Sequence, residues 1–214
     1  MVSVFGCQPH PFFNNMVARE VDKNIPLQIV ILGEPRTGKT AFIRRYTTCH
    51  YYREEQYTPT MGIETTQTHI WINSRGKITR IKVILHEVGN LVTNDDFAEI
   101  MKKSNIALVF FNTNLRGGVA DINRMLGYCD SYSIPTLLVA SRCDEKLKNG
   151  SPGDRLLANY IWKQPPHLPP RMGMEMSSLS CYNLDRPILW AARKWYGDRD
   201  LVGADIPIPE THKL

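Results

Sequence analysis

The sequence has few cysteines, no paired metal-binding cysteines and no long apolar run. Its five cysteines are scattered through 214 residues and none forms a CxxC pair, so the sequence supports neither a disulfide framework nor a zinc site. We identify no signal peptide, transmembrane helix, glycine for myristoylation or C-terminal prenylation box, and we expect no membrane anchor. Unpaired cysteines are typical of a reducing compartment, so we expect the nucleus and/or the cytoplasm.

An extreme charge of either sign is also missing. The net charge is +5, with 22% charged and 43% hydrophobic residues, which excludes collagen-like, coiled-coil and wholly disordered proteins. The mild basic surplus suits phosphate ligands or acidic partners but is too small to indicate nucleic-acid binding, and we expect no DNA partner. The length suits one α/β domain, with or without tails.

Proline and loop-forming residues divide the chain into a central domain and less regular segments. We expect an N-terminal extension over 1–25, a domain over 26–197 and a C-terminal tail over 198–214. Within the domain, a Pro-rich insertion covers about 145–170. Its 165–170 stretch is either a stiff connector or a docking site for a polyproline-binding module.

Apolar runs alternate with segments of helical spacing. The run from Leu27 to Leu32 is almost wholly apolar, as in a strand buried on both faces. Ile81, Val83 and Leu85 alternate with other residues in the second arm of an expected hairpin, whose turn lies at 73–76. Strands that alternate with helices predict an α/β fold, with a mostly parallel six-stranded sheet and helices on both faces. The expected strands cover 27–32, 63–71, 78–85, 106–111, 134–140 and 172–176, and the expected helices cover 40–46, 119–132, 156–162 and 184–196.

One motif carries a specific chemical function. The segment from Gly33 to Thr40 fits the pattern G-x-x-x-x-G-K-[ST], follows an expected strand and opens an expected helix. In this pattern, backbone N–H groups and the helix N-terminus hold phosphates, Lys39 reaches phosphate oxygens, and the Thr40 hydroxyl is a ligand for Mg²⁺. Pro35 has no N–H and Arg36 is bulky, so we expect a loop of altered geometry. The expected phosphate-binding residues are Glu34, Pro35, Arg36, Thr37, Gly38, Lys39 and Thr40.

Together with three further segments, this motif resembles the Ras superfamily of small GTPases and, within it, the nuclear-transport Ran family. Residues 57–64 resemble the first switch, and Thr60 falls on the family threonine that closes over Mg²⁺ and the γ-phosphate. The turn at 73–76 and the segment 182–194 are similar to a hairpin turn and the last helix of the Ran family. The resemblance covers roughly 25–205 and implies the P-loop small-GTPase fold.

The resemblance also implies a guanine site. The family pattern Asn-Lys-x-Asp corresponds to Ser141, Arg142 and Asp144, with a shorter serine in place of asparagine. Asp144 would accept hydrogen bonds from guanine N1 and N2, and Arg142 would stack on the base. The family's base loop corresponds to 177–179, and we expect Ser178 and Leu179 to contact the base. The alternative for Asp144 is a helix cap or a solvated loop acid.

The second switch departs from the family pattern Asp-x-x-Gly-Gln. The sequence reads His86-Glu87-Val88-Gly89-Asn90, and Gly89 keeps an N–H that could meet a γ-phosphate. His86 is a poor Mg²⁺ ligand, and it is either bonded to a backbone group or in contact with a phosphate. Because successive strand residues face opposite ways, we expect Glu87 to point away from the metal. Asn90 is one methylene shorter than glutamine and is only a weak candidate for positioning the hydrolytic water.

These features predict a Ran-like switch or binder of protein partners that binds GTP or GDP, with weak or absent hydrolysis. Thr40 and Thr60 would hold Mg²⁺ with lowered affinity. The resemblance implies protein effectors that bind the switch regions at about 55–64 and 86–100, and transport receptors as further partners. One alternative is a pseudo-GTPase that serves as a structural interaction module, with nucleotide locked in place or lacking. A P-loop kinase or ATPase is a third hypothesis, which Asp144 disfavours.

Overall fold

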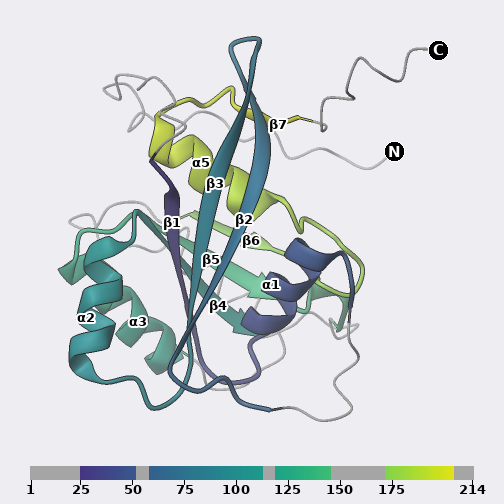
Figure 1. Ribbon diagram of the computed structural model, residues 1–214. Helices are drawn as coiled ribbons and strands as arrows, with labels where there is room; N and C mark the ends of the chain where they lie inside the picture. The colour runs from purple at the N-terminus through teal and green to yellow at the C-terminus, as the bar shows by residue number, and fades with distance from the viewer. Residues whose placement is uncertain (1–24, 52–57, 113–118, 146–171, 205–214) are drawn as a thin grey trace.

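The structure is a computed structural model that describes residues 25–51, 58–112, 119–145 and 172–204 (Figure 1). Most of the expected N-terminal extension and insertion, the expected helix over 156–162 and the end of the chain lie outside the described residues. The described strands are β1 (Leu27–Gly33), β2 (Ile63–Ser74), β3 (Lys77–Val88), β4 (Ile106–Asn112), β5 (Thr136–Ser141), β6 (Met172–Glu175) and β7 (Val202–Gly203). The described helices are α1 (Lys39–Thr48), α2 (Asn94–Lys103), α3 (Val119–Ser131), α5 (Arg186–Tyr196) and a short 3₁₀ turn (Cys143–Glu145).

The strands form one sheet in the order β6-β5-β4-β1-β3-β2-β7. The five strands from β6 to β3 run parallel, whereas β2 pairs antiparallel with β3 and β7 pairs antiparallel with β2. The expected α/β fold with a mostly parallel sheet is therefore confirmed, with seven strands in place of six. The hairpin is also present, and the Gly76 N–H in its turn donates to Asn73 Oδ1 at 3.0 Å.

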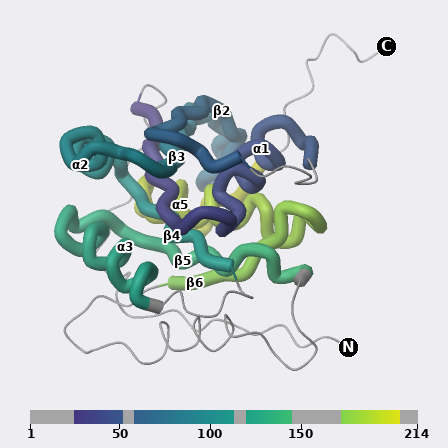
Figure 2. Tube along the Cα trace, turned by 90° about the horizontal axis from the view of Figure 1, so that it is seen from below, coloured from purple at the N-terminus to yellow at the C-terminus, as the bar shows by residue number. Residues whose placement is uncertain are grey.

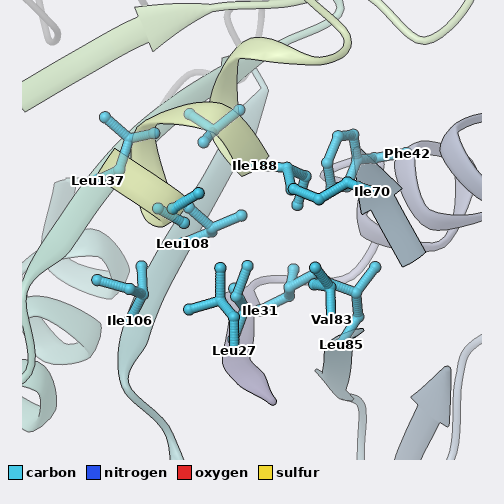
Figure 3. Packing of buried hydrophobic residues seen from close by; sticks show 14 of the residues in the cluster. Leu27, Ile31, Phe42, Ile70, Val83, Leu85, Ile106, Leu108, Leu137 and Ile188 are labelled. Carbon is cyan, nitrogen blue, oxygen red and sulfur yellow. The ribbon is translucent and has the colours of Figure 1, made fainter. Parts of the chain in front are cut away.

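Helices cover both faces of the sheet (Figure 2). Alternate residues of β1 supply two cores, because Leu27 and Ile31 pack with α1 and α5, whereas Val30 and Leu32 pack with α2 and α3. Figure 3 shows side chains of the first core. Each fully buried Leu or Ile stabilises the fold by about 1.5–3 kcal/mol, so both faces contribute. Within the four described ranges, no helix combines the length and the apolar character that a membrane span requires.

Helix α2 lies where the sequence analysis predicts only a switch region. The side chain of Thr93 caps its first turn and accepts a hydrogen bond from the Asp96 N–H at 3.1 Å. Acidic residues lie in the first turn and lysines in the last, which suits the helix dipole. A local capping signal was therefore present in the sequence.

The domain continues past the expected boundary at 197. Gly197 ends α5 with φ 68°, and the next residue, Asp198, is buried and accepts a hydrogen bond from Ser74 Oγ. Leu201 is fully buried, and β7 pairs with β2 at Ile72 and Asn73. Residues 198–204 therefore pack on the domain, which corrects the expected start of the tail.

Candidate functional site

The carboxyl end of β1 leads into a loop that wraps the N-terminus of α1. Gly33 lies so close to β4 that a β-carbon there would be 2.6 Å from the Phe110 carbonyl oxygen. Gly38 precedes α1 with φ 86°, a conformation that glycine adopts without strain. Arg36 has φ 64°, so the bulky residue expected in the loop adopts a left-handed turn. The glycine spacing of the motif thus meets a steric requirement.

Lys39 is buried in the first turn of α1, and its amino group points back at the loop. Its Nζ donates to the carbonyl oxygens of Gly33 at 2.6 Å and of Glu34 at 3.3 Å. Burial lowers the pKa of Lys39, whereas the negative charges of Glu87 and Glu34 act to raise it. The Glu34 carboxylate itself pairs with Arg124 of α3 at 2.8 Å. Lys39 is therefore a desolvated cation, and an anion beside it would restore its lost solvation.

Three side-chain oxygens, which we call the oxygen cluster, meet near Lys39. Thr40 Oγ1 donates to Glu87 Oε1 at 2.5 Å, and Thr60 Oγ1 donates to the same oxygen at 3.2 Å. The hydroxyl oxygens of Thr40 and Thr60 lie 3.2 Å apart. Burial raises the pKa of Glu87, and the hydrogen bond from Thr40 and the charge of Lys39 act in the opposite direction.

The position of Glu87 corrects the expectation that its side chain points away from a metal. Glu87 pairs with Ile31 of β1, whose side chain faces α1, and therefore lies on the α1 face of the sheet. Thr40 is the second residue of α1, so it meets Glu87 across that face.

His86 points to the face of the sheet that α2 and α3 cover, and its ring contacts two side chains. Its Nδ1 lies 3.0 Å from Thr65 Oγ1 and its Nε2 lies 3.2 Å from Gln28 Oε1. Burial lowers the pKa of His86, with a further contribution from the charge of Lys103. A neutral imidazole donates to the Gln28 amide oxygen and accepts from the Thr65 hydroxyl. His86 thus bonds to two side chains and not to a backbone group, and it lies on the face of the sheet away from α1.

The oxygen cluster has the donor chemistry that Mg²⁺ prefers. Octahedral Mg²⁺ with Mg–O distances of about 2.0–2.1 Å places neighbouring ligand oxygens about 3 Å apart. The three distances in the cluster, 2.5, 3.2 and 3.2 Å, lie on either side of that value. Within the described ranges, no three His, Cys, Asp or Glu side chains gather into a group that could hold a metal ion. Thr40, Thr60 and Glu87 therefore fit the ion, whereas the sequence analysis selects only the two threonines.

Backbone hydrogen bonds, which we call the switch ladder, join the segment at Thr60 to the end of β3. The Asn90 N–H donates to Thr60 O at 2.8 Å, the Gly62 N–H to Asn90 O at 2.7 Å, and the Gly89 N–H to Gly62 O at 2.8 Å. A β-carbon at Gly89 would lie 2.2 Å from Thr60 O, so only glycine allows this approach. The Gly89 N–H, which we expect to meet a γ-phosphate, is instead used in the ladder.

A cavity of about 260 Å³ lies between the phosphate loop and the switch ladder. The structure brings nearly all the expected phosphate-site residues to its wall. The lining includes Pro35, Arg36, Thr37, Gly38, Lys39, Thr40, Thr60, Gly89 and Asn90. Glu34 is not part of the lining, whereas Arg44, His50, Glu64 and Glu87 are. None of these four side chains is among the phosphate-site residues expected from the sequence, although Glu64 and Glu87 lie in the two switch segments.

The residues expected to bind guanine lie outside the lining of this cavity. Asp144 is exposed in the 3₁₀ turn that follows β5. The Cys143 N–H donates to Met176 O at 3.3 Å, which places the loop with Ser178 and Leu179 beside this turn. The two loops that the resemblance assigns to guanine are therefore neighbours, although Asp144 and Ser178 are 34 positions apart in sequence.

Ser141 faces the phosphate loop. Its buried Oγ lies 2.6 Å from Thr37 O and 3.0 Å from Phe111 O. Arg142 follows with φ 57°, which starts the turn to Asp144. Ser141 thus joins the turn after β5 to the phosphate loop. From the sequence we expect it instead to contact the guanine base.

Comparisons with known proteins agree with this geometry. The model of the Ras family matches residues 28–151, a range that includes the phosphate loop, the oxygen cluster, the switch ladder and Asp144. The Ras-related protein Rab-32C of Dictyostelium discoideum is similar, with 27% identity over 131 residues that cover 58% of this chain and 54% of the relative. The chain thus spans about half the length of that curated relative.

Proposed function

Because this chain belongs to the Ras family, we propose that it is a GTP-binding switch protein that holds GTP or GDP in the cavity beside the phosphate loop. The observation that carries the proposal is the oxygen cluster beside the buried Lys39. Mg²⁺, when bound, would neutralise charge on the phosphates. Asp144 and Arg142 would recognise guanine, with Ser178 and Leu179 at the neighbouring loop.

Each residue of the site has a distinct role in this proposal. The Lys39 amino group exchanges a carbonyl contact for a phosphate oxygen and thereby regains the solvation that burial removes. The hydroxyls of Thr40 and Thr60 and the carboxylate of Glu87 hold the metal. Glu87 thus takes the part that the family pattern gives to an aspartate, one position later than the alignment through Gly89 predicts.

Hydrolysis is slow in this proposal because no glutamine stands near the water-orienting position. If the family pattern Asp-x-x-Gly-Gln is counted from Glu87, its last position is Leu91, which is 82% exposed and has no hydrogen-bonding group. If it is counted through Gly89, the last position is Asn90, which is shorter than glutamine. A misplaced water lowers the rate steeply, because phosphoryl transfer depends mostly on positioning and electrostatics.

The switch ladder favours a second candidate function, a nucleotide-locked interaction module. Three backbone hydrogen bonds already hold Thr60 and Gly62 against Gly89 and Asn90. The Gly89 N–H must leave Gly62 O before it can sense a γ-phosphate, so the ladder resists a change between GDP and GTP forms. In this candidate the switch surface, with the exposed side chains of Met61 and Leu91, presents one conformation to protein partners.

The finer assignment to a Ran-like role also belongs to the proposal. It rests on the sequence resemblance of the turn at 73–76 and of the segment 182–194. Transport receptors as partners, and the nucleus and/or the cytoplasm as location, follow from it. Binding of a purified transport receptor in the presence of GTP, with none in the presence of GDP, would support this role.

The test of nucleotide binding starts with purified protein that is denatured to release any ligand. Released GTP would indicate slow or absent hydrolysis, and released GDP would indicate turnover. Mg²⁺ with added GTP should raise the melting temperature, whereas ATP should not, because Asp144 accepts from a donor pair that adenine lacks. Lys39→Ala should abolish the shift, and Lys102→Ala, which alters an exposed lysine of α2, should preserve it.

Two results would contradict the proposal. The first is a wild-type protein that releases no nucleotide and shows no melting shift with GTP. The second is a Lys39→Ala variant that folds and binds GTP as tightly as the wild type. A protein that binds GTP and GDP with equal affinity and keeps the same amide protection at Gly62 and Asn90 in both forms would favour the locked interaction module.

A further inference from the structure

The cavity contains more positive charge than Lys39 alone supplies. Its lining includes three basic side chains, Arg36, Lys39 and Arg44, and two acids, Glu64 and Glu87. Glu87 is turned to the two threonines of the oxygen cluster. The amino group of Lys39 already donates hydrogen bonds to two carbonyl oxygens of the loop, so not all of its N–H groups face the cavity. A polyphosphate in this cavity therefore meets basic groups beyond the lysine of the motif.

Arg36 is the basic residue that lies within the phosphate loop itself. It is exposed, it follows Pro35, and it borders the cavity between β1 and α1. Its φ of 64° is left-handed, a conformation that Gly38 adopts at no cost but that disfavours a residue with a β-carbon. Arg75 in the hairpin turn shares this conformation, so it is the place of Arg36 in the cavity wall, and not its backbone, that indicates a ligand.

We propose that Arg36 is a second phosphate-binding cation, which holds the polyphosphate of a guanine nucleotide together with Lys39. The proposal rests on the proposed function and names a residue that determines affinity for the phosphates. A guanidinium is always charged and presents paired N–H donors that match two oxygens of one phosphate. Arg36 thus adds binding that needs neither the metal nor the Gly89 N–H, which the switch ladder uses.

Three substitutions separate the charge of Arg36 from its backbone. Arg36→Gln and Arg36→Lys both keep a β-carbon in the left-handed turn, and only the lysine keeps the cation. Calorimetric titration should show GTP and GDP affinity reduced about tenfold or more in Arg36→Gln and by a smaller factor in Arg36→Lys, which keeps the charge but not the paired donors. The affinity for GMP, which has one phosphate, should fall by a smaller factor in Arg36→Gln. Arg36→Gly should lose affinity as the glutamine variant does, yet raise the melting temperature of the nucleotide-free protein.

Arg75 supplies the matched control. It is also a left-handed arginine, with φ 51°, and it lies in the hairpin turn at the end of the sheet opposite the phosphate loop (Figure 1). Arg75→Gln should leave the affinities for GTP, GDP and GMP unchanged, and Arg75→Gly should raise the melting temperature as Arg36→Gly does. A lower affinity in Arg75→Gln would mean that lost net charge, rather than a contact, explains the effect, and would overturn the proposal.

Binding of inorganic pyrophosphate to the nucleotide-free protein gives a second readout. It should weaken in Arg36→Gln by a similar factor, since the base plays no part in it. If Arg36→Gln binds GTP and pyrophosphate as the wild type does, Arg36 is not a phosphate ligand, and the proposed function stands without it. If the wild type binds neither, the proposed function fails, and the role of Arg36 fails with it.

Discussion

Glu87 Oε1 lies 2.5 Å from Thr40 Oγ1, so a hydrogen bond joins the end of β3 to the first turn of α1 across 47 residues of sequence. The same carboxylate oxygen accepts a hydrogen bond from Thr60, which lies just before β2. One acid therefore orders both threonine hydroxyls that the site would offer to a metal.

Glu87→Gln should weaken the dependence of GTP binding on Mg²⁺. The amide keeps an acceptor for Thr40 but loses the negative charge that a hard cation needs. The ratio of GTP affinities with Mg²⁺ and with EDTA should fall about tenfold or more, as for the loss of a charged contact. Glu64→Gln is the matched control, because Glu64 pairs with Glu87 in the β2–β3 register and lines the same cavity. An unchanged ratio in Glu87→Gln would remove Glu87 from the metal site.

His86 should make the stability of the nucleotide-free protein depend on pH. Burial lowers its pKa, so below an unfolded-state pKa of about 6.5 the unfolded chain binds a proton that the folded chain resists. Stability should be constant above that pH and should fall as pH drops toward the lowered value, by at most about 1.4 kcal/mol per pH unit for one group. Denaturant unfolding between pH 8 and 5 measures the slope.

Two variants assign that slope to its source. His86→Gln should flatten the part of the curve below about pH 6.5. His69→Gln alters an exposed histidine of β2 and should leave the curve as in the wild type. If His86→Gln and the wild type lose stability in parallel, the buried imidazole is not the cause.

Gly89→Ala should destabilise the protein and loosen the switch ladder. The new β-carbon would lie 2.2 Å from the Thr60 carbonyl oxygen, which is backbone and cannot rotate away. We expect a loss of about 1–3 kcal/mol and faster amide exchange at Gly62 and Asn90. In contrast, Gly127→Ala in α3 meets no atom within 4 Å and should stabilise by about 0.5–1 kcal/mol. Equal melting temperatures for the two variants would show that the close approach is not required.

Ser141→Ala should loosen the connection between the guanine turn and the phosphate loop. Its hydroxyl is buried against Thr37 O and Phe111 O, and its loss leaves an acceptor unsatisfied at a cost of about 1–3 kcal/mol. GTP affinity should fall with stability, because both halves of the nucleotide site depend on this bond. Ser131→Ala, at an exposed position of α3, should change stability by less than about 0.5 kcal/mol. A Ser141→Ala protein as stable as Ser131→Ala would contradict this role.

The sequence predicts the phosphate loop well because its determinants are local. The motif from Gly33 to Thr40 is continuous, and the flanking strand and helix follow from their own apolar patterns. The oxygen cluster is different, because it joins residues from α1, from the segment that precedes β2 and from β3. Its third member also depends on which face of β3 points to α1.

A signal for that face was nevertheless present in the sequence. Ile81, Val83 and Leu85 alternate in β3 and pack in the core beneath α1. The next residue in that series is Glu87, not His86. Alignment of the family pattern through Gly89 instead places Glu87 on the wrong face of β3. The strand's own periodicity is the better guide here, because the sheet enforces it.

His86 and Glu87 lie on opposite faces of β3, so adding or removing one residue before them would exchange the faces that their side chains occupy. A single insertion between the hairpin turn and position 86 would rotate every following side chain through the sheet. The imidazole would then face the threonines, and the carboxylate would be buried beneath the second pair of helices without its hydroxyl donors. An extra residue in the turn at 73–76 lies outside the parallel pairing and leaves this arrangement intact. Variation in chain length is therefore tolerated at one end of the hairpin and excluded at the other.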